Sequence, residues 1–252
     1  MTSLHSPAIA SASPTSAPGS IGAGWYRREE AIMGTSIEVE LFARDRTEAE
    51  VAIGAVMAEM HRVDATMSPH KVTSELSILN AHAADNPITV GEGLFGLLAR
   101  ALEFSKLSGG AFDITFASAG RLYDYRAGIG PDDAALAQAL PLIDWRHVLL
   151  DASDRSVRFA RQGVRIDLGG FAKGHAVDNA TAILRRRGIR HAMVSAGGDS
   201  RVIGDRRGRP WTIGVRDPRR PGQVAAMLPL EDVSISTSGD YERYFDADGT
   251  RF

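Results

Sequence analysis

The stretch from Arg165 to Ala180, RIDLGGFAKGHAVDNA, constrains the fold of this chain more than any other. Apolar residues at positions 164, 166 and 168 alternate with polar ones, which is typical of the end of a strand. From Ala172 onward, apolar residues recur at helical spacing until Gly188, a residue type that favours a helix C-terminus. The stretch therefore predicts a strand, a Gly169-Gly170 turn and a helix in immediate succession.

This arrangement is suited to binding a phosphate group. Gly169 and Gly170 have no Cβ, so they expose the N–H groups at the helix start, where the macrodipole and Lys173 both favour an anion such as a pyrophosphate. Asp167 is placed to accept hydrogen bonds from a ligand or to help hold a cation. The same residues also fit a plain connecting turn with solvated charges, and the local pattern does not decide between the two. Neither G-x-x-x-x-G-K-[ST] nor G-x-G-x-x-G occurs, which disfavours a P-loop nucleotidase and a standard dinucleotide fold.

Composition narrows the class of protein. With 44% hydrophobic and 24% charged residues, the 252-residue chain is typical of a soluble globular protein. Its net charge of −2 gives no general attraction to nucleic acid or to an anionic membrane, so any anion site must be local. The absence of cysteine excludes disulfides, thiolate metal ligands and a cysteine nucleophile. No stretch approaches the ~20 apolar residues of a transmembrane segment.

The domain organisation is predicted to be simple. Residues 1–24 are rich in Ser, Ala, Pro and Gly and contain no Lys or Arg, which predicts a disordered tail. They contain no signal peptide or lipobox, so the sequence as written predicts a cytoplasmic protein. Residues 25–252 are predicted to form one folded domain.

Several further elements are predicted from periodicity and turn signals. A T-x-x-E capping box at Thr47 and Glu50 is expected to start one helix. The expected helices cover residues 48–65, a short segment from Ser74, 94–105 and 131–140, and the expected strands cover 32–42, 157–168, 192–195, 211–218 and 233–237. Asp248-Gly249 predicts a hairpin turn whose return arm, Thr250 to Phe252, is too short to complete a sheet, so we expect a truncated chain.

Three other positions are candidates for ligand contacts. Met33 fits either a core methionine or a thioether packed against a flat ring. Asp113, after a glycine pair and an aromatic residue, fits either a group at a polar ring edge or a cap for the next turn. Gly197-Gly198-Asp199 forms a second glycine pair followed by an acid, and we expect it to share a cleft wall with the first pair.

Six motifs, occurring in a consistent order over residues 25–252, resemble those of the ApbE family, the FAD:protein FMN transferases or flavin transferases. The motifs are Met33-Gly34-Thr35, M-S-P-H-K-x-x-S-E-L-S-x-L-N at 67–80, G-G-A-F-D at 109–113, D-L-G-G-F-A-K-G-x-A-V-D at 167–178, G-G-D at 197–199 and T-S-G-D-Y at 237–241. Each motif alone is weak, but six in register are specific.

The resemblance implies an α+β fold of two interleaved α+β subdomains, with FAD in a cleft between them and Mg²⁺ at its pyrophosphate. It places Gly170 where a backbone carbonyl ligates the metal. His70 stands where the family usually has an aromatic residue, and its imidazole is able to stack on a ring. The positions matched to FAD contacts are Met33, His70, Ala111, Phe112, Asp113, Asp167 and Lys173.

The activity implied by the resemblance is Mg²⁺-dependent transfer of FMN from FAD to a Thr or Ser hydroxyl of an acceptor flavoprotein, with release of AMP. No catalytic base is identified. The alternatives are hydrolysis of FAD to FMN and AMP, and a non-catalytic FAD-binding module. In the family, T-S-G-D-Y leads into H-I-x-D-P, and a later Asp and Thr pair completes the metal site. Neither occurs here, so we expect the C-terminal part of the fold to be missing and Mg²⁺ to bind poorly. Family members are often periplasmic or membrane-associated.

Overall fold

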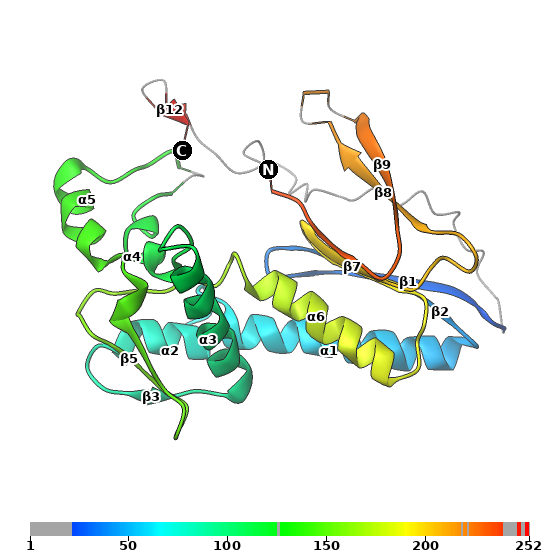
Figure 1. The fold of residues 1–252 in the computed structure, drawn as a ribbon, viewed down its shortest axis with the longest axis horizontal. Coiled ribbons are helices and arrows are strands. Elements are labelled where there is room, and N and C mark those ends of the chain that lie inside the picture. The colour runs from blue at the N-terminus through cyan, green and yellow to red at the C-terminus, as the bar shows by residue number, and fades with distance from the viewer. Residues whose placement is uncertain are drawn as a thin grey trace. The chain divides into compact units, whose positions relative to one another are not determined.

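The computed structural model describes residues 22–124, 127–217, 219–220 and 222–238, together with the backbone of 246–247 and 250–251. The chain divides into two compact units. Unit 1 contains residues 1–62 and 173–242, and unit 2 contains residues 63–172 and 243–252. Because the chain leaves unit 1 and later returns to it, the two units are interleaved in sequence. Both helices and strands occur throughout, so the predicted α+β class is confirmed (Figure 1).

Unit 1 is built on a five-stranded sheet with the order β1-β2-β6-β7-β10, in which all neighbours are antiparallel. The strands are β1 (Gly24–Ile32), β2 (Thr35–Ala43), β6 (Ala192–Ala196), β7 (Asp199–Ile203) and β10 (Ser234–Ser236). The sequence predicted β2, β6 and β10 but not β1. That strand carries consecutive charges rather than an alternating pattern, and Arg27 Nε lies 2.8 Å from Glu38 Oε1 of the neighbouring strand.

Two helices and a hairpin pack against this sheet within unit 1. The long helix α1 (Arg46–Met67) runs beside α6 (Ala172–Arg186), and Asn179 Nδ2 of α6 donates to Glu59 Oε1 of α1 over 2.8 Å (Figure 1). A separate hairpin of β8 (Trp211–Arg216) and β9 (Val224–Leu230) buries Trp211 and Ile213 against Met193 and Val202 of the sheet. The helices predicted at 48–65 and from Ala172 and the strand predicted at 211–218 are therefore confirmed, although Pro218 lies outside the described residues.

The predicted capping box of α1 is wrong, and the correct one lies just before it. Asp45 Oδ1 accepts the N–H of Glu48 at 2.8 Å, and Glu48 Oε2 accepts the N–H of Arg44 at 2.7 Å. The D-x-x-E pattern thus satisfies the N–H groups of Glu48 and Arg44, not those of Glu50 and Thr47 that the predicted box would have bonded. The helix accordingly begins at Arg46 rather than at residue 48.

Unit 2 combines short helices with a three-stranded antiparallel sheet of order β3-β5-β4. Its helices are α2 (Glu75–His82), α3 (Glu92–Leu107), α4 (Ala117–Gly120) and α5 (Asp133–Ala139); its 3₁₀ turns are η1 (Ile114–Phe116), η2 (Leu140–Leu142) and η3 (Trp145–His147); and its strands are β3 (Ile88–Thr89), β4 (Val148–Asp151) and β5 (Ser156–Phe159). The predicted helices at 74, 94–105 and 131–140 are confirmed. The hairpin predicted at Asp248-Gly249 is confirmed by the pairing of β11 (Asp246–Ala247) with β12 (Thr250–Arg251), although the two turn residues lie outside the described part. Among the described residues, no helix combines the length and apolar character needed to cross a membrane.

The strand predicted to end at Leu168 is not a strand beyond Phe159. Val164, Ile166 and Leu168 are buried, at 1–2% exposure, as their alternation indicates. Their segment pairs with no strand in the part of the chain that the structure describes, however. Asn80 instead provides both partners for Ile166, with Oδ1 accepting its N–H at 2.8 Å and Nδ2 donating to its carbonyl at 2.9 Å.

The neighbouring backbone groups are paired in the same way. Ser118 Oγ accepts the N–H of Arg165 at 3.0 Å and donates to its carbonyl at 3.3 Å. The N–H of Asp167 donates to the Ile114 carbonyl at 3.0 Å. Side chains thus take over the role of a neighbouring strand, which buried backbone groups require. Alternation identified a buried extended segment but not what would pair with it.

Replacing Asn80 with alanine should therefore destabilise unit 2. The substitution leaves the buried N–H and C=O of Ile166 without partners, which should lower the free energy of unfolding by about 2 to 4 kcal/mol. Urea denaturation followed by circular dichroism measures the change. The exposed Asn86 is a matched control, and its alanine variant should change stability little. Equal stability of the two variants would show that Asn80 does not hold the segment.

Candidate functional site

Two of the sequence-predicted motifs lie together within unit 2. The loop at 109–113 packs against the turn at 167–171: the rings of Phe112 and Phe171 have centroids 5.2 Å apart. A Cβ added to Gly170 would lie 3.7 Å from Cε2 of Phe112. The ring of Phe104, on α3, meets Phe171 edge-on at 5.4 Å. The structure therefore brings Phe112 and Gly170 together, and adds two phenylalanines that the sequence did not single out.

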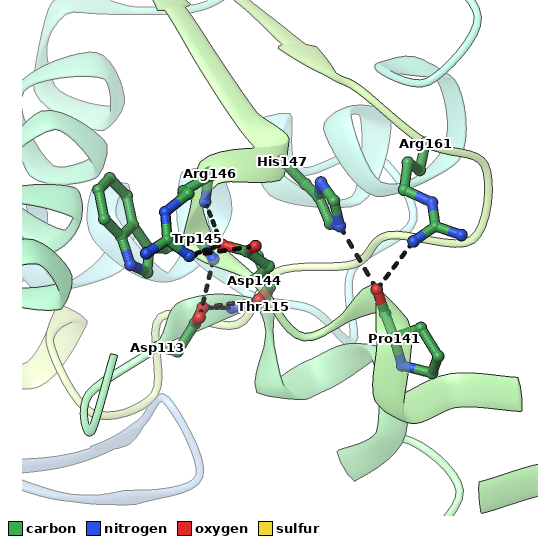
Figure 2. A network of polar contacts seen from close by, with 8 residues as sticks. All are labelled: Asp113, Thr115, Pro141, Asp144, Trp145, Arg146, His147 and Arg161. Atoms are coloured by element: carbon green, nitrogen blue, oxygen red, sulfur yellow. Dashed lines mark hydrogen bonds and ion pairs between the residues drawn. The ribbon is translucent and has the colours of Figure 1, made fainter. Parts of the chain in front are cut away.

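Asp113 caps the turn that follows it. Its Oδ1 accepts from the N–H of Thr115 at 2.8 Å and from the hydroxyl of Thr115 at 2.6 Å. Its Oδ2 accepts from the N–H of Trp145 at 2.8 Å (Figure 2). The capping interpretation is therefore confirmed. A carboxylate has about four lone-pair sites. The half-buried Asp113 can therefore accept a hydrogen bond from a ligand while it also caps the turn.

The Gly169-Gly170 turn is exposed but largely satisfies its own donors. Asp167 Oδ1 accepts the N–H of Gly169 at 2.7 Å, and the N–H groups of Phe171 and Ala172 donate to the Leu168 carbonyl at 2.8 and 2.7 Å. Neither glycine has a positive φ, so they are not required for a left-handed backbone. A Cβ at Gly169 would lie only 2.8 Å from Asp167 Oδ1. Fewer N–H groups are therefore available to a ligand than the sequence predicted. Gly170 is the residue of this turn that can contact one.

Within unit 1, four chain segments end at the same end of the sheet. The register pairs Ala196 with both Ile37 and Asp199, and Asp199 with Ser236. Gly197 and Gly198 form the turn that joins β6 to β7 at this end of the sheet. A Cβ at Gly197 would lie 2.8 Å from Thr35 Oγ1, and one at Gly198 would lie 2.6 Å from the Thr237 carbonyl oxygen. Three motifs far apart in the sequence therefore meet here; Gly239 to Tyr241 of the third lie outside the described residues.

The first turn of α6 reaches the same place. A Cβ added to Gly174 would lie 3.9 Å from Asp199 Oδ2. Lys173 immediately precedes Gly174, so the predicted phosphate-binding lysine belongs to the helix turn that contacts the second Gly-Gly-Asp motif. Lys173 is half-buried.

Met33 occupies a strained turn at this end of the sheet. It joins β1 to β2 through a two-residue hairpin, in which Ile32 pairs with Thr35 and both Met33 and Gly34 have positive φ, 55° and 69°. This geometry corresponds to a type I′ turn, which strongly favours asparagine or glycine over methionine at its first position. Met33 is half-buried and therefore not a core residue. An unfavourable residue retained in a turn is a reason to infer a ligand contact.

The other predicted contacts are less constrained. His70 is exposed in the loop between α1 and α2, and its backbone N–H donates to Ser68 Oγ at 3.3 Å. Its proposed stacking role stays a prediction. Ala111 is exposed in the turn before Phe112, where its N–H donates to the Ser108 carbonyl at 3.3 Å.

The described residues do not form a complete magnesium site. They contain no group of three or more His, Asp or Glu side chains that could hold a metal ion. The Gly170 carbonyl is a single ligand, and one oxygen of the neighbouring Asp167 is already bonded to Gly169. Mg²⁺ requires about six oxygen ligands in near-octahedral geometry. We therefore assign no chemical step to a metal.

A polar network on α1 and α6 was not predicted from the sequence. His175 Nε2 lies 3.0 Å from Asn179 Nδ2, which also donates to Glu59 Oε1. Arg62 holds Glu59 through Nε at 2.7 Å and Nη2 at 2.6 Å, and these hydrogen bonds lower the pKa of Glu59. Because the Asn179 amide nitrogen is a donor, His175 Nε2 must be the acceptor and hence unprotonated. The helical spacing of His175 and Asn179 is the only sequence signal for this network.

Replacing Met33 with asparagine should separate stability from binding. The positive φ suits asparagine better, so the free energy of unfolding should rise by up to about 1 kcal/mol. Loss of the thioether should weaken FAD binding about two- to tenfold if Met33 packs on a ring. Urea denaturation and titration of FAD fluorescence measure the two effects. A variant with unchanged FAD affinity would return Met33 to a purely structural role.

The His175 network should make stability depend on pH. Burial lowers the pKa of His175, and the nearby Glu59 carboxylate only partly offsets this effect. In the unfolded chain the imidazole regains a pKa of about 6.5, so the unfolded state binds more protons and the fold loses stability as the pH falls through that value.

The urea midpoint of the wild-type chain should therefore fall more between pH 8 and pH 5.5 than that of His175→Gln, which cannot be protonated in this range. An identical fall in both proteins would show that His175 does not contribute to the pH dependence.

Comparison with known proteins shows which family these features belong to. The model of the ApbE family matches residues 33–252. A FAD:protein FMN transferase of Treponema pallidum is 33% identical over 246 residues, covering 90% of this chain and 68% of the relative. One from Rhodobacter capsulatus is 35% identical over 229 residues, covering 88% of this chain and 43% of the relative. The chain thus spans between about two fifths and two thirds of the length of these two relatives.

Solved structures agree with this assignment. The crystal structure of the ApbE protein from Thermotoga maritima has a TM-score of 0.82 and 33% identity, and the match covers 91% of this chain and 75% of that one. The flavin transferase ApbE from Vibrio cholerae has a TM-score of 0.79 at 25% identity, over 90% of this chain and 75% of that one. The motifs, the fold and the length of the match point the same way: the chain belongs to the ApbE family.

Proposed function

We propose that this chain is a flavin transferase that moves FMN from FAD onto an acceptor flavoprotein. The observation that carries the proposal is the exposed turn at Gly170, packed against Phe112 and leading directly into the α6 turn that bears Lys173. The relatives named as FAD:protein FMN transferases support it, since the chain belongs to their family.

In this proposal the chain supplies binding and charge stabilisation. Lys173 and the N-terminal end of α6 take the pyrophosphate, where positive charge offsets the negative charge that develops as the bond breaks. Phe112 and Met33 provide apolar surface for aromatic rings, and Asp113 and Asp167 accept hydrogen bonds from the ligand. His70 and Ala111 complete the proposed FAD contacts.

The reaction is a substitution at phosphorus. The hydroxyl oxygen of a Thr or Ser on the acceptor bonds to the FMN phosphorus, the bond from that phosphorus to the bridging oxygen breaks, and AMP leaves with that oxygen. The hydroxyl proton passes to solvent or to a base that we do not assign. We propose that the reaction requires Mg²⁺, with Gly170 as one carbonyl ligand, and that the remaining ligands come from the pyrophosphate, water or residues beyond those described.

The test is to incubate the chain with FAD and an acceptor flavoprotein domain, with Mg²⁺ or with EDTA. FMN transfer predicts an FMN-sized mass increase on the acceptor and release of AMP, both lost in EDTA. Release of AMP without labelling would identify a FAD hydrolase instead. Binding of FAD without release of AMP would identify a binding module.

Replacing Lys173 with alanine tests the phosphate-binding turn within this proposal. Loss of the cation beside two phosphate charges should weaken FAD binding by about ten- to hundredfold. Lys106→Ala removes an equal charge from an exposed position on α3 and serves as the control. Calorimetric titration of FAD compares the two variants, and equal affinities would remove Lys173 from the proposed site.

A further inference from the structure

Asp199 is held in place by the strand beside it. It is the first residue of β7, and the register places Ser236 of β10 directly opposite. Ser236 Oγ donates to Asp199 Oδ1 over 2.6 Å. Asp199 is half-buried and Ser236 is exposed, so this pair lies at the surface of unit 1.

The second carboxylate oxygen of Asp199 faces the first turn of α6. Oδ2 would lie 3.9 Å from a Cβ at Gly174, and it has no hydrogen-bond donor among the residues that the structure describes. A partly buried carboxylate oxygen without a donor is an acceptor available to a ligand.

An ion pair between Arg201 of β7 and Asp178 of α6 links the two elements. Arg201 Nη1 donates to Asp178 Oδ1 at 2.7 Å. Asp199 and Arg201 share one face of β7, because side chains alternate along a strand. Gly174 and Asp178 share one face of α6 for the corresponding reason. The hydrogen bond from Ser236 and the ion pair between Arg201 and Asp178 therefore both hold Asp199 next to Gly174.

Gly174 is not required by the backbone. Its φ is not positive, and a Cβ at this position would meet Asp199 at an ordinary van der Waals distance. Glycine inside a helix is less stable than alanine by about 1 kcal/mol. The described contacts do not require glycine at this position, whereas a ligand group that bonds to Asp199 Oδ2 and lies against the backbone of Gly174 would be obstructed by a side chain.

We propose that Asp199, Ser236 and Gly174 form a subsite that binds a hydroxyl group of FAD. This inference rests on the proposed function and adds residues that it does not include. A carboxylate repels phosphate groups but accepts hydrogen bonds from hydroxyls, and FAD carries hydroxyls on its ribityl chain and on its ribose. Lys173 and Gly174 both belong to the first turn of α6, so the subsite lies at the helix end to which the proposed function assigns the pyrophosphate.

The test compares FAD affinity of the wild type and Asp199→Asn in EDTA, so that no metal takes part. The asparagine keeps the shape and can still accept from Ser236, but it presents an amide donor or a weaker acceptor to the ligand. We expect the Kd for FAD to rise about ten- to hundredfold at an unchanged melting temperature. Glu231→Gln, a charge-matched change at an exposed position in unit 1, should leave Kd unchanged.

Gly174→Ala provides an independent variant should Asp199→Asn fold poorly. The added methyl group should keep or raise the melting temperature while weakening FAD binding, because it fills the space assigned to the ligand. Displacement of FAD by FMN or by AMP then identifies the hydroxyl. Asp199→Asn should weaken only FMN if the ribityl chain binds here, and only AMP if the ribose does.

The outcomes separate this inference from the proposed function. A wild-type chain that fails to bind FAD overturns both. If the wild type binds FAD and both Asp199→Asn and Gly174→Ala bind it equally well, the subsite is wrong and the proposed function stands. An effect of Asp199→Asn on FAD binding that appears only with Mg²⁺ present overturns the subsite and indicates a metal ligand instead. Weaker binding of FAD by Asp199→Asn, with binding of FMN and AMP both unchanged, also overturns the subsite.

Discussion

The candidate site in unit 2 depends on the pairing of one buried extended segment, residues 164–168, by side chains rather than by a strand. Asn80 bonds both backbone groups of Ile166, and Ser118 bonds both of those of Arg165. This anchoring fixes where the following turn begins. The Gly170 turn can then stay exposed while the three apolar side chains of the segment before it, Val164, Ile166 and Leu168, are buried.

In unit 1 the corresponding constraint is the close approach of strand ends. A side chain at Gly197 or Gly198 would collide with Thr35 or with the backbone at Thr237, so the glycines allow segments from three motifs to meet. Two features at this end cost stability without serving the fold: a methionine at positive φ and a glycine inside a helix. Such departures from local preference are expected where residues contact a ligand.

Periodicity predicted the long helices and three strands of the main sheet, because one buried face leaves a regular trace in the sequence. It failed where partners are remote. Asn80 and Ile166 are 86 positions apart, and the charges of β1 have partners on other elements, as Arg27 does with Glu38 of β2 and Arg28 with Glu50 of α1. The motifs located most of the candidate site, but Ser236 has no sequence signal, since only the strand register places it opposite Asp199.

The most direct test of the central claim is hydrogen–deuterium exchange of the intact chain, measured by mass spectrometry with and without FAD. If the α6 residues 173–175 and the strand ends at 197–200 hold the ligand, FAD should slow exchange in both segments, because bound ligand shields their backbone and suppresses local opening. The exposed Asp151–Arg155 turn should exchange at the same rate in both conditions. Binding of FAD without any slowing at 173–175 and 197–200 would contradict the assignment of the site.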